Sequence, residues 1–195
     1  MKQDEIRRRL IDGTIHVIAR DGLDKATTKL IGKETETNEA YIYRCFVDKE
    51  DMFAKTFEKL DRELIDVLES NVYITQNGEI PLVERCKMLY MVIWKFLLGN
   101  EDKCKCYIRY FYSPYFKKYS EEAHKENYKH FTEKISVAFK DGANVWMILN
   151  HILNVMLDFA IKVYDGAVPD NDDTAEHVFR LIFASVNQYF NLKGN

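Results

Sequence analysis

The sequence has few of the residues that break or cross-link a chain. Its 195 residues include three prolines and four cysteines, and the cysteines show no paired framework. So low a proline content is compatible with a helical fold. Cysteines without a paired framework suit a reducing compartment rather than a disulfide scaffold. No run approaches 18 uninterrupted apolar residues, which argues against a membrane span. The charged start MKQDEIRRRL lacks an apolar signal region, so we expect a cytoplasmic protein.

The sequence also lacks the motifs of catalysis. It has no glycine-rich phosphate loop, no nucleophile motif and no carboxylate pair that can be assigned to acid–base work. Cys104 and Cys106 are two residues apart, so on a helix they point to nearly opposite sides and cannot chelate one ion. The five histidines show no ligand spacing on one helix. We therefore predict that the protein is not an enzyme and has no cofactor and no metal site.

The net charge of −3 is not that of a basic nucleic-acid-binding protein. Residues 1–60 carry 12 Lys and Arg and 12 Asp and Glu, and the remaining residues carry the whole excess of acid. Phosphate binding needs a local cluster of positive groups and helix N-termini, not a basic whole chain. The charge therefore neither supports nor excludes DNA binding.

Composition and periodicity predict an all-α fold. Hydrophobic residues make up 47% of the chain, which is enough for a packed core. Apolar residues recur at helical spacing, and Gly, Asn, Asp and Pro separate the segments. The expected helices cover residues 2–20, 28–34, 39–45, 49–71, 81–98, 102–112, 120–140, 143–165 and 173–192, with a break over 72–80. We predict two domains, 1–48 and 49–195, linked by the helix over 49–71.

The stretch TTKLIGKETETNEAYIYRCFVDKEDMF, residues 27–53, has the most informative pattern. Thr27 and Asn38 are good N-caps for two short helices around a tight turn. Such a pair is a helix-turn-helix, whose second helix can enter a DNA major groove. Ile42 and Phe46 share one helix face, which leaves Tyr41 exposed. In the alternative interpretation, the tyrosines of this helix merely cover the edges of a small core.

Residues 6–53 resemble the TetR/AcrR family of bacterial transcription regulators. The resemblance rests on LIDGTIHVIARDGLDKATT, on AYIYRCF and on DKEDMF, in this order and spacing. It implies an N-terminal three-helix helix-turn-helix DNA-binding domain followed by a helical ligand-binding and dimerisation domain. It further implies that the DNA-binding residues are Thr27, Thr28, Lys29, Asn38, Glu39, Ala40, Tyr41, Tyr43, Arg44 and Lys49.

Three residues depart from the family pattern. Glu36 stands in the turn where glycine is usual, and a left-handed backbone there would cost about 1–2 kcal/mol. Gly32 stands where the family prefers alanine, which adds a helix penalty of roughly 1 kcal/mol. Thr37 replaces the usual apolar residue beneath the turn. We expect a somewhat soft helix-turn-helix that binds DNA modestly.

The remaining sequence is rich in aromatic and aliphatic residues. Apolar pockets with a few polar anchors bind small molecules, although aromatic residues at helical spacing can equally form plain core. The candidate ligand-binding residues are Tyr90, Trp94, Tyr107, Phe111, Tyr128 and Trp146. The last two helices are apolar over more than one face, which indicates either a helix internal to the domain or a two-fold dimer interface. The candidate interface residues are Ile152, Met156, Phe159, Phe179, Ile182, Phe183, Val186 and Phe190.

Taken together, the sequence predicts a ligand-responsive transcriptional regulator. We expect a homodimeric repressor that binds a palindromic operator in double-stranded DNA and is released by a small hydrophobic or aromatic effector. A first alternative is a regulator-like helical protein that acts mainly through a protein partner, with weak or no sequence-specific DNA binding. A second is a helical protein that binds a small molecule without regulatory output. No membrane association is expected.

Overall fold

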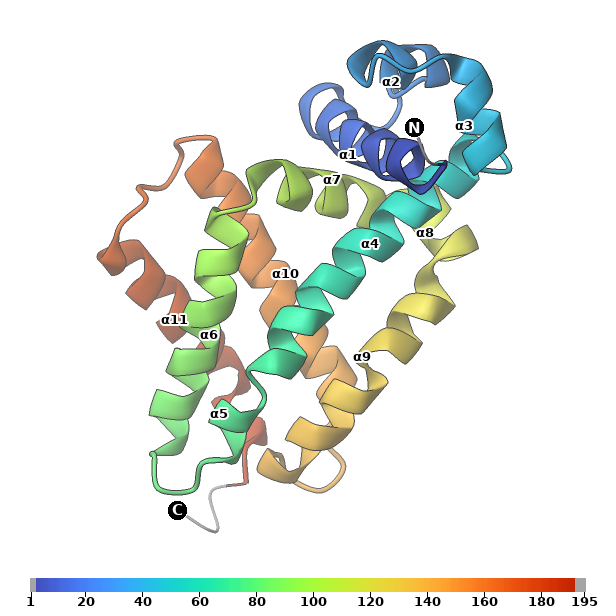
Figure 1. Ribbon diagram of the computed structural model, residues 1–195. Coiled ribbons are helices and arrows are strands. Elements are labelled where there is room, and N and C mark those ends of the chain that lie inside the picture. Colours follow the sequence, from blue (N-terminus) through green and yellow to red (C-terminus); the bar gives the residue numbers. More distant parts are fainter. Residues whose placement is uncertain (1–2, 192–195) are drawn as a thin grey trace. The chain divides into compact units, whose positions relative to one another are not determined.

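The computed structural model describes residues 3–191, and it confirms the all-α prediction (Figure 1). No strand occurs in that range, where the sole β contact is an isolated bridge between Phe139 and Phe190. The α-helices are α1 (Gln3–Asp21), α2 (Thr28–Glu34), α3 (Glu39–Cys45), α4 (Lys49–Ser70), α5 (Tyr73–Gln76), α6 (Leu82–Leu98), α7 (Glu101–Phe111), α8 (Pro114–Tyr119), α9 (Glu121–Ile135), α10 (Val145–Tyr164) and α11 (Asp172–Val186). Two short 3-10 helices, η1 (Ser136–Ala138) and η2 (Asn187–Tyr189), follow α9 and α11.

The chain divides into two compact units. Unit 1 comprises Met1–Glu63 and Asp102–Lys125, and unit 2 comprises Leu64–Glu101 and Glu126–Asn195. Helices α4 and α9 each begin in unit 1 and continue in unit 2. This division differs from the predicted boundary at residue 48, because α7 and α8 belong to the same compact unit as the three N-terminal helices.

Unit 1 has a close-packed apolar interior. Leu10 of α1, Ile31 of α2 and Ile42 of α3 have no exposed surface, so the three helices share one core. The side chain of Arg109 on α7 reaches the C-terminal end of α1, where its Nη1 donates hydrogen bonds to the carbonyl oxygens of Ile18 and Ala19. Carbonyls in the last turn of a helix lack intrahelical partners. Arg109 therefore supplies donors to α1 and attaches α7 to it.

Unit 1 also contains a buried polar cluster. Asp61 of α4 is 1% exposed, and its Oδ1 lies 2.8 Å from Nδ1 of His124 on α9. The same oxygen accepts a hydrogen bond from the Tyr107 hydroxyl of α7 at 3.2 Å. The ring of Phe57 lies 4.8 Å from that of Tyr107. A buried carboxylate is tolerated only when it is hydrogen-bonded, and these contacts hold α4, α7 and α9 together within the unit.

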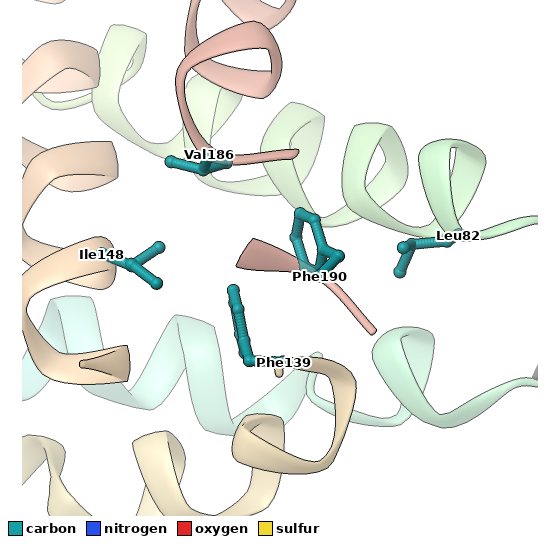
Figure 2. Packing of buried hydrophobic residues seen from close by; sticks show 5 residues of the cluster. All are labelled: Leu82, Phe139, Ile148, Val186 and Phe190. Carbon is teal, nitrogen blue, oxygen red and sulfur yellow. The ribbon is translucent and has the colours of Figure 1, made fainter. Parts of the chain in front are cut away.

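Unit 2 is built around α6, α10 and α11. At one end of its core, Leu82, Ile148, Val186 and the rings of Phe139 and Phe190 come together (Figure 2). The two rings are stacked, with centroids 4.6 Å apart. Two backbone hydrogen bonds flank the stack, Asn191 N to Ala138 O and Lys140 N to Tyr189 O. The segment after α11 is thereby fixed against the segment after α9.

Three expected elements differ from the structure. The predicted break over 72–80 contains the single-turn helix α5. The predicted helix over 120–140 begins earlier, at Pro114, as α8, then restarts as α9 and ends as a 3-10 turn. Pro114 stands at the first position of α8, where proline favours helix initiation. The last helix ends at Val186, and η2 follows it.

Helix α10 is the most apolar element. By length and composition it could cross a membrane, the one such helix in the described part of the chain, with a mean hydropathy of 1.3. A core helix of a globular protein passes the same test. Its buried residues, among them Leu149, Leu153 and Met156, lie on one side within unit 2. Its other apolar residues are mostly half-buried, so the protomer does not enclose the helix fully.

Candidate nucleic-acid interface and ligand cavity

Helix α2 begins as the sequence predicts. Thr27 has an extended backbone, and its Oγ1 accepts a hydrogen bond from Leu30 N at 3.1 Å. The hydroxyl hydrogen of a capping threonine can still donate to an outside acceptor such as a phosphate. Thr27 and Lys29 are exposed, whereas Thr28 is half-buried. The start of α2 therefore offers a hydroxyl and an ammonium group to solvent.

The turn after α2 is a Schellman motif centred on Glu36. Thr37 N donates to Gly32 O at 2.8 Å, and Glu36 N donates to Lys33 O at 3.3 Å. Glu36 takes the left-handed position of this motif, with φ of 50°, where glycine is the usual residue. The strain expected at Glu36 is thus present in the backbone. The side chain of Arg9 lies 3.5 Å from its carboxylate, so a positive group of α1 faces this negative charge.

The interpretation of Gly32 as a mere helix penalty needs correction. A Cβ atom at this position would lie 2.8 Å from the backbone oxygen of Thr37. Backbone cannot yield as a flexible side chain can, so alanine would push the turn away from α2. The turn has therefore closed to a distance that only glycine permits. Sequence reasoning missed this because the contact depends on the path of the chain after Glu36.

Helix α3 separates buried from exposed residues as predicted. Ile42 is 0% exposed and Phe46 is 4% exposed, whereas Tyr41 is 38% and Tyr43 is 60% exposed. The guanidinium of Arg44 lies over the Tyr41 ring, 5.1 Å from its centroid. Such a cation–π contact stabilises both groups in one geometry. The outer side of α3 is therefore aromatic and positively charged at its C-terminal end.

The N-terminus of α3 is capped by Asn38. Its Oδ1 accepts a hydrogen bond from Ala40 N at 2.9 Å, and its side-chain NH₂ group is a further possible donor. Asn38 and Ala40 are exposed, and Glu39 is half-buried. Burial raises the pKa of the Cys45 thiol at the other end of the helix, so the thiol is neutral there. The small Ala40 between polar neighbours gives this end of the helix room to approach another surface.

The start of α4 carries a reciprocal cap. Asp48 Oδ1 accepts from Asp51 N at 2.7 Å, and Asp51 Oδ2 accepts from Val47 N at 3.0 Å. Lys49 follows at the first helical position, with its ammonium 5.5 Å from the centroid of the Phe53 ring. A cation held at the positive end of a helix adds to the helix dipole, so the two together favour a bound anion.

The predicted DNA-binding residues thus lie at the starts of α2, α3 and α4 and on the outer side of α3. The prediction did not include Lys33, which is exposed and lies one helical turn after Lys29. Lys29 and Lys33 are four residues apart and so lie on the same face of α2, and this spacing could have identified Lys33.

Comparison with known proteins agrees with this geometry. Residues 10–56 match the family described as bacterial regulatory proteins, tetR family. Over 59 residues the chain is 32% identical to the HTH-type nicotine-responsive transcriptional repressor HdnoR of Paenarthrobacter nicotinovorans. That match spans 30% of this chain and 30% of the relative. Residues 10–56 therefore match the N-terminal part of TetR-family regulators.

Solved structures extend the likeness in fold to nearly the whole chain. A TetR family transcription regulator from Marinobacter aquaeolei VT8 has a TM-score of 0.76 at 15% identity, over 93% of this chain and 95% of the other. The transcriptional regulator FadR from Bacillus subtilis, solved in complex with stearoyl-CoA, has a TM-score of 0.68 at 17% identity, over 90% and 96%. Identities this low establish the fold alone, and here the fold includes both units.

Unit 2 contains an apolar cavity of about 110 Å³. Helices α6, α10 and α11 supply most of its wall, and Leu68 of α4 contributes to it as well. Tyr90 lines the cavity and donates its hydroxyl hydrogen to Ala175 O at 2.9 Å, and burial raises the pKa of this hydroxyl. Burial also raises the pKa of the Cys86 thiol to about 11, so this lining thiol is neutral.

Of the six predicted ligand-binding residues, only Tyr90 lines this cavity. Trp94 stacks on Tyr90, with ring centroids 5.8 Å apart, but does not reach the wall. Tyr128 and Trp146 form an edge contact elsewhere in unit 2. Tyr107 and Phe111 lie in unit 1. Aromatic residues at helical spacing could not indicate which side of each helix faces a void, and most of the wall is aliphatic.

The candidate dimer-interface residues lie at or near this cavity. Seven of the eight line the cavity of their own protomer, and Phe159 is half-buried beside it on α10. The lining residues are Ile152, Met156, Phe179, Ile182, Phe183, Val186 and Phe190. The wide apolar stripe on the last helix thus lines this cavity, and its part in an interface with a second chain stays a prediction.

Proposed function

We propose that this chain is a cytoplasmic TetR-family transcriptional regulator that binds operator DNA through α2 and α3. The outer side of α3 carries the proposal, because Ile42 and Phe46 anchor the helix while Tyr41, Tyr43 and Arg44 remain outside. The three capped helix starts add phosphate-binding donors to it. The nicotine-responsive repressor related to this part of the chain supports repression as the regulatory sense.

We further propose that the protein acts as a homodimer through the outer sides of α10 and α11. Met147 on α10 is 66% exposed, and Leu181 on α11 is 59% exposed. His151 and Ser185, each one turn further along its helix, are 2.9 Å apart, so the two exposed stripes are adjacent. Two copies of this surface would form a four-helix interface, and two-fold symmetry would match a palindromic operator.

The cavity of unit 2 is the proposed effector site. Helix α4 supports a link between effector and DNA, because Leu68 lines the cavity and Lys49 begins the same helix. These residues are separated by roughly 28 Å of helix at 1.5 Å per residue. An effector can shift the equilibrium only by its difference in affinity for the DNA-bound and DNA-free forms. Release from the operator requires tighter effector binding to the DNA-free form.

Selection of bound fragments from randomised duplex DNA, with purified full-length protein at moderate salt, tests the proposal. We expect a palindrome whose half-sites lie about one helical turn, 34–36 Å, or somewhat more apart. Absence of any enriched sequence, with and without added metabolite extract, would contradict operator binding and favour a protein partner.

Two matched variant pairs refine the test. Lys49→Ala should weaken DNA binding evenly across sequences and reduce by about one the slope of log affinity against log salt concentration. Lys55→Ala changes an exposed lysine of the same helix that is paired with Glu58, and it should leave this slope unchanged.

Leu181→Glu should convert the dimer to a monomer in sedimentation experiments. Val137→Glu, at a position 80% exposed in η1, should not.

A further inference from the structure

The hydroxyl groups of the residues that line the cavity of unit 2 are hydrogen-bonded within the protein. Thr75 Oγ1 donates to Val72 O at 2.6 Å, and the Tyr90 hydroxyl donates to Ala175 O at 2.9 Å. Among the described residues of the wall, almost no polar surface faces the cavity. Neither hydroxyl is therefore presented to an occupant.

Arg85 and Cys86 also line the cavity without offering it a charge. The Arg85 guanidinium donates to Thr75 O at 2.6 Å and has a further contact within the protein, so the aliphatic stem of the side chain forms its part of the wall. Burial raises the pKa of the Cys86 thiol to about 11, so this thiol is neutral near pH 7. A neutral thiol is only a weak hydrogen-bond donor.

The rest of the described wall is aliphatic and aromatic. At one end of the core, the stacked rings of Phe139 and Phe190 form part of it, beside Leu82 and Val186 (Figure 2). A polar group that enters such surroundings loses its hydration and gains no hydrogen bond in return. Water is excluded for the same reason, because an ordered water needs two to four polar partners. An apolar occupant therefore has no polar competitor in this space.

The size of the cavity limits its occupant. At about 110 Å³ it is smaller than the engineered cavity of ~150 Å³, lined by Leu, Ile and Phe, that stays dry and takes up benzene. A single ring with at most a small alkyl group, or a short alkane, suits this volume. Larger polycyclic or long-chain molecules do not fit without movement of α6, α10 or α11.

We propose that the cavity binds a small hydrocarbon of about one ring, without charge and without hydrogen-bonding groups. This class is narrower than that of hydrophobic molecules in general, because it excludes acids, amines and phenols of the same size. The role of the hydrocarbon as an effector rests on the proposed function, but its binding does not. Burial of apolar surface is the driving force, since the wall supplies little else.

Three probes of similar size separate these cases. Toluene is a hydrocarbon, phenol replaces its methyl group by a hydroxyl, and benzylamine carries a positive charge near pH 7. Each is titrated into full-length protein without DNA, by calorimetry and by the fluorescence of Trp94, whose ring stacks on that of the cavity residue Tyr90. We expect toluene to bind at least about tenfold more tightly than phenol, a difference of about 1.4 kcal/mol, and benzylamine to bind most weakly. Phenol binding as tight as that of toluene, a preference for benzylamine, or no binding of toluene would overturn the proposal.

Variants that fill the cavity assign the binding to it. Ile152→Phe adds volume at a half-buried position on the wall and should weaken toluene binding at least tenfold. Val137→Phe adds a ring at a position 80% exposed in η1 and should leave toluene binding unchanged. If Ile152→Phe does not fold, Leu89→Phe fills the cavity from α6 and should weaken binding likewise. Undiminished toluene binding in a folded cavity-filling variant would overturn the assignment, and the ranking in the unmodified protein tests the ligand class without any variant.

The outcome is independent of operator binding. Toluene binding that is lost in Ile152→Phe but leaves affinity for a selected operator unchanged would uphold the site and contradict the regulatory link. An operator whose binding is insensitive to all three probes, together with no toluene binding in the titrations, would uphold DNA recognition and contradict the site.

Discussion

The two units of this chain are stabilised in different ways. In unit 1 the helices α2 and α3 have seven residues each, and their ends are fixed by side-chain caps and by the Schellman turn at Glu36. In unit 2 the helices α6, α10 and α11 have 15–20 residues and enclose a cavity of about 110 Å³. A helix of seven residues forms too few backbone hydrogen bonds to be stable alone, so it depends on local hydrogen bonds at its ends. Long helices depend on packing, and their packing can leave room for a ligand.

This difference has a functional counterpart. A surface that reads DNA must hold its side chains in fixed positions, as the anchors Ile42 and Phe46 do for α3. A unit that responds to a ligand needs space and an alternative arrangement of packed elements. A fully buried anchor in unit 1 and a cavity in unit 2 suit these two proposed tasks.

The largest expected effect is the loss of a core side chain in unit 1. Ile42→Ala should lower the free energy of unfolding by about 2–5 kcal/mol, because Ile42 is fully buried among α1, α2 and α3. The matched change Ile152→Ala, at a half-buried residue on the cavity wall, should cost clearly less. Urea unfolding followed by circular dichroism measures both. Equal losses would remove the contrast in packing between the units.

Loss of a helix cap comes next. Asp48→Ala should cost about 1 kcal/mol, because Asp48 caps the start of α4 through the backbone N–H of Asp51. Asp66→Ala, an exposed aspartate further along α4, serves as the control and should cost nothing. Thermal unfolding compares the melting temperatures of the two variants. Similar melting temperatures would show that the Asp48 cap does not stabilise the start of α4.

The turn at Glu36 should respond in the opposite direction. Glu36→Gly should raise the free energy of unfolding by about 1 kcal/mol, because glycine adopts the left-handed backbone without strain. It should also strengthen DNA binding, since a negative charge leaves the turn. Glu36→Ala removes the charge but keeps the strain, so it should improve DNA binding without raising the melting temperature. An unchanged melting temperature and DNA affinity in Glu36→Gly would refute the expectation of a soft turn.

The smallest effect is expected inside the cavity. Ile152→Phe should change the free energy of unfolding by less than about 1 kcal/mol, because the larger side chain can enter the void. The same substitution at Ile42 should cost about 1–3 kcal/mol, since this side chain is fully buried. Calorimetric melting of both variants compares them. A costly Ile152→Phe would mean that the cavity wall cannot accept added volume.

The sequence predicted unit 1 far better than unit 2, for a physical reason. Thr27 and Asn38 mark helix starts because each side chain bonds to a backbone group two or three residues away. Those signals are local and survive without knowledge of the tertiary fold. The contact between Gly32 and Thr37 was missed because it depends on the closure of the turn, although it lies within the same motif.

In unit 2 the decisive contacts are distant in sequence. Periodicity identified α10 and α11 as apolar helices but could not assign their sides, so residues such as Ile182 and Val186 were predicted for a partner rather than for the cavity. The attachment of α7 to unit 1 through Arg109 was equally invisible.

Two tyrosines provide the most direct test of the central claim that unit 1 reads DNA through α3. Tyr43 of unit 1 is 60% exposed and Tyr73 of unit 2 is 64% exposed, so loss of either hydroxyl should leave the fold intact. The affinity of Tyr43→Phe and of Tyr73→Phe for duplex DNA is measured by fluorescence anisotropy at fixed salt. We predict that Tyr43→Phe weakens binding roughly threefold to tenfold through the loss of one phosphate hydrogen bond, and that Tyr73→Phe has no effect. Equal affinities of the two variants and the unmodified protein would contradict the claim.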